Sequence, residues 1–387
     1  MPQQRTQVIT EIPPIVFQDY PVDIHIRIYK AGAWYQADIF AVGQVQRVPI
    51  EMSAHDVISI NRQLQEAMQA VTTEMSNNQK LASSKLDKEV RALAELGNFA
   101  FKRVFSHPDA LSIIQQLLNL GRRVSIQVAS EDFFLPWELM YPQNVDEPLS
   151  CEHFWGMNLI ISRVIVQEHR PGAFVSPVIV VTPRPCLGLL TYDRLTGVTQ
   201  KEIPFFRQLA AEGKIELLHL RDLDPNPAKK AQEIREFRNF WQNPLNLAHF
   251  ACHAIYDDKA PEKSYVLLTD RFAVSLMDID VYEVAITGHP LIVMNACETG
   301  NLNPLYTSHF AAMLLKHGAR GVVATECAVP DDFAADFVQQ LYAHLLAGET
   351  LGDSLLAARR YFLEERDNPS GLLYSMYAPP SIRLVRS

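Results

Sequence analysis

Apolar and polar side chains alternate along the first part of the chain. Residues 22–28 change regularly from one type to the other, which predicts a β-strand with one buried face. A second run, residues 34–42, follows a short turn, so the two runs predict a β-hairpin. Ser53 and Asp56 have the spacing of a capping box, and the apolar residues that follow predict a helix over residues 53–73.

A polar stretch, residues 77–85, follows this helix and predicts a linker. We therefore expect a small β/α module over residues 1–80, with a structural or docking role. A larger unit over residues 84–387 follows. It comprises an N-terminal part, residues 84–170, and a core, residues 175–387.

In the larger unit, short apolar runs alternate with stretches of helical spacing. Strands are expected at residues 123–128, 178–182, 215–220, 247–253, 291–296, 321–324 and 381–385. Helices are expected over residues 84–104, 110–120, 201–212, 228–241, 309–317, 332–347 and 352–365, with a hairpin-like insert at 264–276. Apolar runs of strand length indicate strands that are buried on both faces. Their alternation with helices predicts an α/β fold with a mostly parallel sheet and helices on both faces.

Two residues with reactive side chains stand at the ends of neighbouring apolar runs. The run 247–253 ends at His253, and the next run ends at Cys297. Open parallel sheets place their sites at the carboxyl ends of the strands, and adjacent strands lie ~4.8 Å apart. An imidazole there can withdraw the thiol proton, so that the thiolate attacks a carbonyl carbon. The alternative explanation is that both residues only pack strand ends.

Longer segments around these residues resemble a known family. HFACHA (249–254) and MNACETG (294–300) are similar to two signature segments of the CHAT-domain family of caspase-like, clan CD cysteine peptidases, which is related to the separases and metacaspases. FLPWELM (134–140) and the block 309–332 resemble two further segments of that family. The resemblance runs in order from about residue 96 to residue 385.

This resemblance implies a caspase-like fold and a catalytic dyad. His253 would be the general base and Cys297 the nucleophile, and the backbone N–H groups of Ala254 and Cys297 would stabilise the oxyanion. The chain departs from the family at two positions. Ala254 stands where Gly usually follows the catalytic His, and Cys327 stands where Trp is common.

Four acidic residues are candidates for the substrate pocket. Asp331 and Asp332 follow a predicted strand at the same sheet edge, where related peptidases use an acid to bind a basic side chain of the substrate. The alternative for Asp332 is a helix N-cap. Asp257, like its neighbour Asp258, either orients the substrate or is simply solvated. Glu298, beside the nucleophile, is a candidate for positioning a loop.

Composition excludes several other classes of protein. The 387 residues carry a net charge of −9 and contain no basic block, which argues against nucleic-acid binding. His249 and Cys252 do not complete a zinc site with the dyad, because His249 would lie too deep in the strand and Cys252 would point to the opposite face. We expect no metal and no cofactor. The five cysteines are few, odd in number and far apart, which favours a reducing cytoplasm over a disulfide framework.

The sequence therefore favours a cytoplasmic cysteine endopeptidase that cleaves a protein partner through a thioester. Its first residues do not have the pattern of a signal peptide, and the apolar runs are too short to span a membrane. The resemblance implies a bacterial defence or signalling role, with activation by a protein partner or a signal. A catalytically silent, caspase-like scaffold is the alternative.

Overall fold

The computed structural model describes most of the chain. The described residues are 22–41, 43–78, 84–166, 176–192, 194–220, 223, 226–257, 259–270, 272–298 and 306–387. For residues 77–78, 84–85, 117, 227, 296–298 and 306, the description covers the backbone alone.

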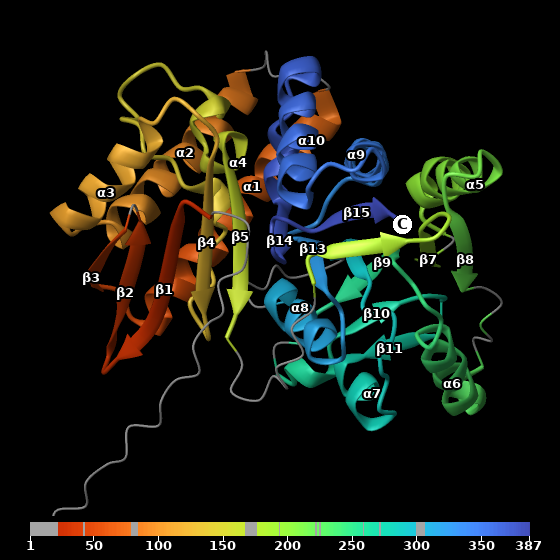
Figure 1. Ribbon diagram of the computed structural model, residues 1–387. Coiled ribbons are helices and arrows are strands. Elements are labelled where there is room, and N and C mark those ends of the chain that lie inside the picture. The colour runs from red at the N-terminus through yellow and green to blue at the C-terminus, as the bar shows by residue number, and fades with distance from the viewer. Residues whose placement is uncertain are drawn as a thin grey trace, which may run out of the picture.

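The first sheet has five strands, in the order β3-β2-β1-β4-β5 (Figure 1). Their bounds are β1 (Ile24–Ala31), β2 (Trp34–Ala41), β3 (Gln44–Ile50), β4 (Val124–Ser130) and β5 (Leu159–Ile165). Strands β1 to β3 form an antiparallel meander, whereas β1, β4 and β5 run parallel to one another. In β1, buried residues alternate with half-buried ones, as the pattern at 22–28 predicts.

Helices and short turns accompany this sheet. They are α1 (Ala54–Asn78), α2 (Ser84–Val104), α3 (Pro108–Leu118), η1 (Trp137–Leu139), η2 (Cys151–His153) and α4 (Trp155–Asn158). The predicted capping box is present, because the Ser53 N–H donates to the Asp56 carboxylate and the Asp56 N–H donates back to Ser53 Oγ. Of the predicted linker, residues 79–83 lie outside the described residues. Strand β1, before the expected boundary near residue 80, pairs with β4, which lies after it, so the first sheet contains strands from both sides. The division into domains stays a prediction.

The second sheet carries the candidate dyad. Its strands are β7 (Cys186–Thr191), β8 (Glu216–Leu220), β9 (Leu247–Ile255), β10 (Tyr265–Leu267), β11 (Ala273–Ser275), β12 (Leu291–Glu298), β13 (Gly321–Thr325) and β14 (Tyr374–Tyr377). The order β8-β7-β9-β12-β13 is parallel throughout, and β14 closes the far edge in antiparallel orientation. Strands β9, β12 and β13 consist largely of buried apolar residues.

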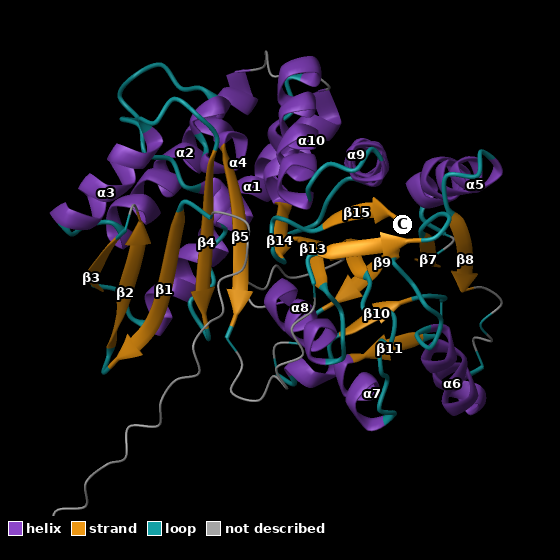
Figure 2. Cartoon of the chain, viewed as in Figure 1, coloured by secondary structure: helices purple, strands orange, loops and turns teal. Residues whose placement is uncertain are grey.

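Helices cover both faces of the second sheet (Figure 2). On one face lie the π-helical turn η3 (Val198–Glu202) with α5 (Ile203–Ala211), and α9 (Asp331–Leu346). On the other lie α6 (Lys230–Phe240), α7 (Leu276–Val281) and α8 (Tyr306–Lys316). The remaining turns are η4 (Pro227–Lys229), η5 (Pro261–Lys263) and η6 (Pro369–Leu373). The predicted α/β fold with a mostly parallel sheet is confirmed.

One predicted strand has a different partner from the expected one. The run 178–182 forms β6 (Val178–Val181), which pairs with β15 (Arg383–Arg386) in a separate two-stranded sheet. Val180 is 58% exposed, so β6 buries only one face, whereas the central strands bury both. A strand exposed on one side belongs at the periphery, and the apolar run alone does not distinguish these two cases.

A buried charge cluster joins the two sheets where β5 lies beside β14. The Arg163 guanidinium on β5 donates to the carboxylates of Glu138 and Glu326. Arg359, on α10 (Leu351–Arg366), lies 3.4 Å from Glu138 through Nη2. All four side chains are at most 5% exposed. Because each charge has an opposite partner, burial is tolerated, and the cluster holds the PWEL segment against the second sheet.

Candidate active site

The candidate site lies where β9 changes its partner. The first half of β9 pairs with β7, in a register that ends with Thr191 opposite Ala251. From His253 onward the same edge of β9 pairs instead with the short strand β10. The other edge pairs with β12 along its whole length. The sheet therefore splits on one side of His253, at the carboxyl edge where parallel sheets place their ligands.

His253 and Cys297 are direct neighbours in the parallel register of β9 and β12. Residues opposite each other in such a register lie on the same face of the sheet, ~4.8 Å apart at the backbone. The side chain of Cys297 lies outside the described part of the structure. The backbone alone therefore brings together the two residues that the sequence singles out.

The imidazole of His253 lies against the aromatic ring of Tyr192, with ring centroids 5.2 Å apart. Tyr192 follows β7, and its hydroxyl donates to Asp270 at 2.7 Å. Arg194 forms an ion pair with the same carboxylate. Nδ1 of His253 is buried and has no hydrogen-bond partner among the described residues. Buried polar atoms are nearly always paired, so an exception calls for a functional explanation.

His249, which lies four residues earlier on β9 and thus two strand repeats deeper, is a useful contrast. Its Nε2 lies 2.6 Å from Glu202 and its Nδ1 lies 3.4 Å from the hydroxyl of Tyr342. It is completely buried, and both ring nitrogens have partners. His249 is therefore a fully hydrogen-bonded core residue, whereas the nearby His253 keeps a nitrogen free of described partners.

Ala254, expected to supply an oxyanion N–H, is fully buried and lies in register with both β10 and β12. It occupies a regular strand, so the Cβ that distinguishes it from Gly causes no left-handed strain. Asp257 accepts hydrogen bonds from the backbone N–H groups of Lys259 and Ala260, which fixes the loop after β9. Asp258, and the side chain of Glu298, lie outside the described part.

Asp331 and Asp332 stand in the first turn of α9, at the carboxyl side of β13. The N-cap expected at Asp332 is wrong, because the helix begins one residue earlier, behind Pro330, and has no side-chain cap. Asp332 is 80% exposed and forms an ion pair with Lys201 at 3.1 Å. Both acids, with Asp336, line a groove of about 610 Å³.

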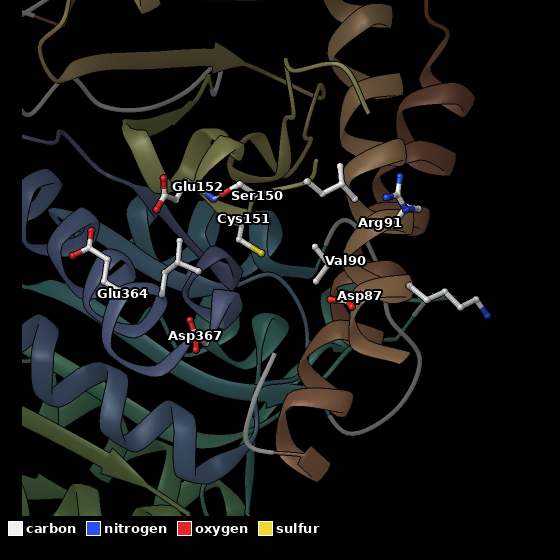
Figure 3. A pocket seen from close by; sticks show the side chains of 11 residues that line it. Asp87, Val90, Arg91, Ser150, Cys151, Glu152, Glu364 and Asp367 are labelled. Carbon is white, nitrogen blue, oxygen red and sulfur yellow. Dashed lines mark hydrogen bonds between the residues drawn. The ribbon is translucent and has the colours of Figure 1, made fainter. Parts of the chain in front are cut away.

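Other cysteines have the environment of unreactive thiols. Cys151 lines a cavity of about 900 Å³ between α2, η2 and the end of α10 (Figure 3). Burial raises the pKa of its thiol to about 12, and the nearby carboxylates of Asp367 and Glu152 add to the rise. Burial likewise raises the pKa of Cys186 to about 11. Both thiols are protonated near neutral pH, so neither is activated as a nucleophile.

Three residues near the dyad were not predicted from the sequence. Tyr192, Glu202 and Asn295 reach the site region from different elements, and only Asn295 offers a clue, since it stands two residues before Cys297 in the same strand phase. In the described part of the chain, no three His, Cys, Asp or Glu side chains gather as a metal site would require. No helix among the described residues is long and apolar enough to cross a bilayer.

Comparisons with known proteins identify a family for this chain. Residues 43–380 match the CHAT domain family. A probable protease of Vitiosangium sp. (strain GDMCC 1.1324) is 31% identical over 150 residues, which are 37% of this chain and 20% of that relative. The chain thus spans about a fifth of the relative's length.

Two structures of the Saccharomyces cerevisiae separase–securin complex match this chain in a comparison of structures. The one at 3.0 Å resolution has a TM-score of 0.52 and 12% identity, and the match covers 92% of this chain and 30% of that one. The one at 2.6 Å resolution has a TM-score of 0.49 at 12% identity, over 94% and 30%. At this identity the first match shows a shared fold alone. Because the family match spans residues 43–380, this chain belongs to the CHAT-domain family of caspase-like proteins.

Proposed function

We propose that the chain is a cysteine endopeptidase with His253 as general base and Cys297 as nucleophile. The observation that carries this proposal is the register of β9 and β12, which sets these two residues opposite each other at the carboxyl edge of the sheet. Nδ1 of His253, which has no hydrogen-bond partner among the described residues, and the family membership support it.

The chemistry follows from the two groups. His253 takes the thiol proton, and the Cys297 sulfur forms a bond to the scissile carbonyl carbon while the carbonyl π electrons move to oxygen. Backbone N–H groups, for which Ala254 and Cys297 are our candidates, stabilise this oxyanion. When the intermediate collapses, the C–N bond breaks and the leaving amine takes the proton from His253. Water then attacks the thioester, again giving a proton to His253, and the thiolate leaves.

The substrate is proposed to be a protein with a basic side chain at the cleavage site. Three carboxylates, those of Asp331, Asp332 and Asp336, line the groove beside α9 together with one guanidinium group, that of Arg366. Lys201 forms ion pairs with Asp332 and Asp336, so the acidic groups outnumber the basic ones by three to two. Roles for Asp257 and Glu298 in the pocket remain predictions. Activation by a protein partner, a place in bacterial defence and a cytoplasmic location are likewise proposals, which the family resemblance suggests.

An activity probe tests the reaction class. The pure protein is incubated with an acyloxymethyl-ketone peptide carrying Lys or Arg next to the warhead, and the labelled cysteine is identified by mass spectrometry. We expect selective labelling of Cys297 that is abolished by His253→Ala. Asp331→Asn should weaken labelling by the basic probe more than labelling by a Leu-containing one. If the basic probe and the Leu-containing probe label wild type and Asp331→Asn equally, the proposal of an acidic pocket for a basic side chain is contradicted.

A silent scaffold is the second candidate, favoured by Ala254 in place of the usual Gly. The strand conformation of Ala254 removes the strain argument for it, because its backbone needs no positive φ. Labelling of Cys297 no faster than that of Cys186, with or without candidate partner proteins, would favour the scaffold.

A further inference from the structure

Five buried polar side chains form a continuous chain of hydrogen bonds beneath the candidate dyad. Glu202 uses both carboxylate oxygens: Oε2 lies 2.6 Å from Nε2 of His249, and Oε1 accepts from the Asn295 amide at 3.0 Å. At the two ends, Tyr342 lies 3.4 Å from Nδ1 of His249, and Tyr374 donates to the Asn295 carbonyl at 2.7 Å. All five side chains are at most 3% exposed.

This network connects the two strands that carry the dyad. His249 precedes His253 by four residues on β9, and Asn295 precedes Cys297 by two on β12, so the four positions share one strand phase. Glu202 comes from outside the sheet, at the end of the π-helical turn η3. Its single carboxylate therefore bridges β9 and β12 below the dyad. Such π-turns occur often at functional sites.

The burial of these groups has no explanation in packing alone. Both strands are otherwise apolar at their centres, and an apolar residue at position 295 would fill the sheet without the cost of burying an amide. A fully paired polar network, in contrast, fixes one geometry of the groups that it joins. The end of β9 needs such support, because β7 leaves it after Ala251 and only the three-residue strand β10 replaces it.

We propose that Glu202 is a positioning residue that fixes β9 relative to β12, so that His253 and Cys297 are held opposite each other. Its catalytic consequence rests on the proposed peptidase function, whereas its effect on the strand ends does not. Glu202 lies too deep to touch a substrate, and it acts through His249 and Asn295.

A matched pair of variants separates hydrogen bonding from volume. In Glu202→Gln, the new amide still accepts from Asn295 and donates to His249, whose other nitrogen then donates to the Tyr342 oxygen. In Glu202→Leu, the volume is nearly kept and both bonds are lost. Hydrogen–deuterium exchange is followed in peptides that cover residues 251–257 and 293–298. Peptides from β1 and β4 serve as the remote control.

We expect Glu202→Leu to lower protection in the two strand-end peptides by about tenfold or more, with β1 and β4 unchanged and Glu202→Gln close to wild type. Unchanged protection in Glu202→Leu would overturn the proposal. So would an equal loss in Glu202→Gln, or a loss spread over β1 and β4, which would indicate general destabilisation. If Glu202→Leu does not fold, Tyr374→Phe, which removes one terminal hydroxyl of the network, takes its place. This variant must show a loss of hydrogen-exchange protection that is confined to the β12 peptide.

The same proteins are then treated with the acyloxymethyl-ketone probe. If Glu202 is a positioning residue, Glu202→Leu lowers the maximal rate of inactivation and leaves the probe's binding constant within about threefold of the wild-type value. Glu202→Gln should restore the rate. A wild-type protein whose Cys297 is not labelled would defeat the proposed function, and the exchange data would still decide the role of Glu202.

Discussion

Glu138 gives the most demanding stability prediction, because its carboxylate is fully buried and is shared by two arginines. It accepts from Arg163, lies 3.4 Å from Arg359 Nη2, and lies 3.4 Å from the donating Ser375 hydroxyl. The change Glu138→Gln keeps the volume but removes one of the cluster's two negative charges. Arg163 keeps its ion pair with Glu326, whereas Arg359 is left without an ion-pair partner among the described residues.

Removing one partner of a buried ion pair costs about 3–5 kcal/mol. With an unfolding entropy of ~2.1 cal/mol/K per residue, the 387-residue chain has ~0.8 kcal/mol/K, so a cooperative transition should fall by roughly 4–6 °C. The matched control is Glu364→Gln, in a half-exposed i,i+4 pair with Arg360. There we expect about 0.5 kcal/mol or less.

Urea unfolding, followed by fluorescence and circular dichroism, measures the free energy of unfolding of both variants, and thermal unfolding measures the shift in transition temperature. Adding Arg359→Met to Glu138→Gln leaves Arg163 and Glu326 as a neutral pair, so the double variant should be more stable than Glu138→Gln alone. The reasoning would be refuted if Glu138→Gln and Glu364→Gln lost the same stability, or if the second substitution simply added its own cost.

Three further perturbations test the region of the dyad. Gly197→Ala places a Cβ 2.5 Å from the carbonyl oxygen of Asp331, so we expect a loss of about 1–3 kcal/mol in urea unfolding, and an unchanged midpoint would contradict the close approach. Tyr192→Phe keeps the ring beside His253 and should alter the rate of probe inactivation by less than about threefold. Tyr192→Ala should slow inactivation by more than about tenfold. Equal rates in the two variants would exclude a packing role for the ring. Burial lowers the pKa of His309 in the folded protein. The unfolded chain therefore binds more protons just below pH 6.5, and the free energy of unfolding falls on acidification. Between pH 7.5 and 5.5, His309→Phe should therefore lose less stability than wild type does.

The sequence was most informative where apolar runs were long and ended in reactive residues. The runs that became β9 and β12 predicted both strands and the position of His253 and Cys297 within them, because a strand buried on both faces leaves a clear pattern. Strand β7 was missed because Gly188 interrupts its run. Only the fold explains this glycine, since a Cβ there would lie 2.7 Å from Phe240 and 2.8 Å from Leu245.

Several peripheral strands and the long-range polar contacts could not be predicted from the sequence. Strands β3, β5 and β14 were not predicted, and β14 has only four residues, too few for a periodic signal. Glu202 stands at the start of the helix expected over residues 201–212, where a charged side chain is usually exposed, and its hydrogen-bond partners are 47 and 93 residues away. No local pattern records such contacts, which arise only when η3 packs onto the sheet.

The central claim is that His253 activates Cys297, and one measurement addresses it directly. The second-order rate of iodoacetamide alkylation is measured for each cysteine of the native protein between pH 5 and 9, in wild type and in His253→Ala. We predict that Cys297 reacts fastest at pH 7 and that its rate falls by more than about tenfold in His253→Ala, while Cys186, whose pKa is about 11, reacts slowly in both. If Cys297 reacts at the same rate in both proteins across this range, the account of a His–Cys dyad is wrong.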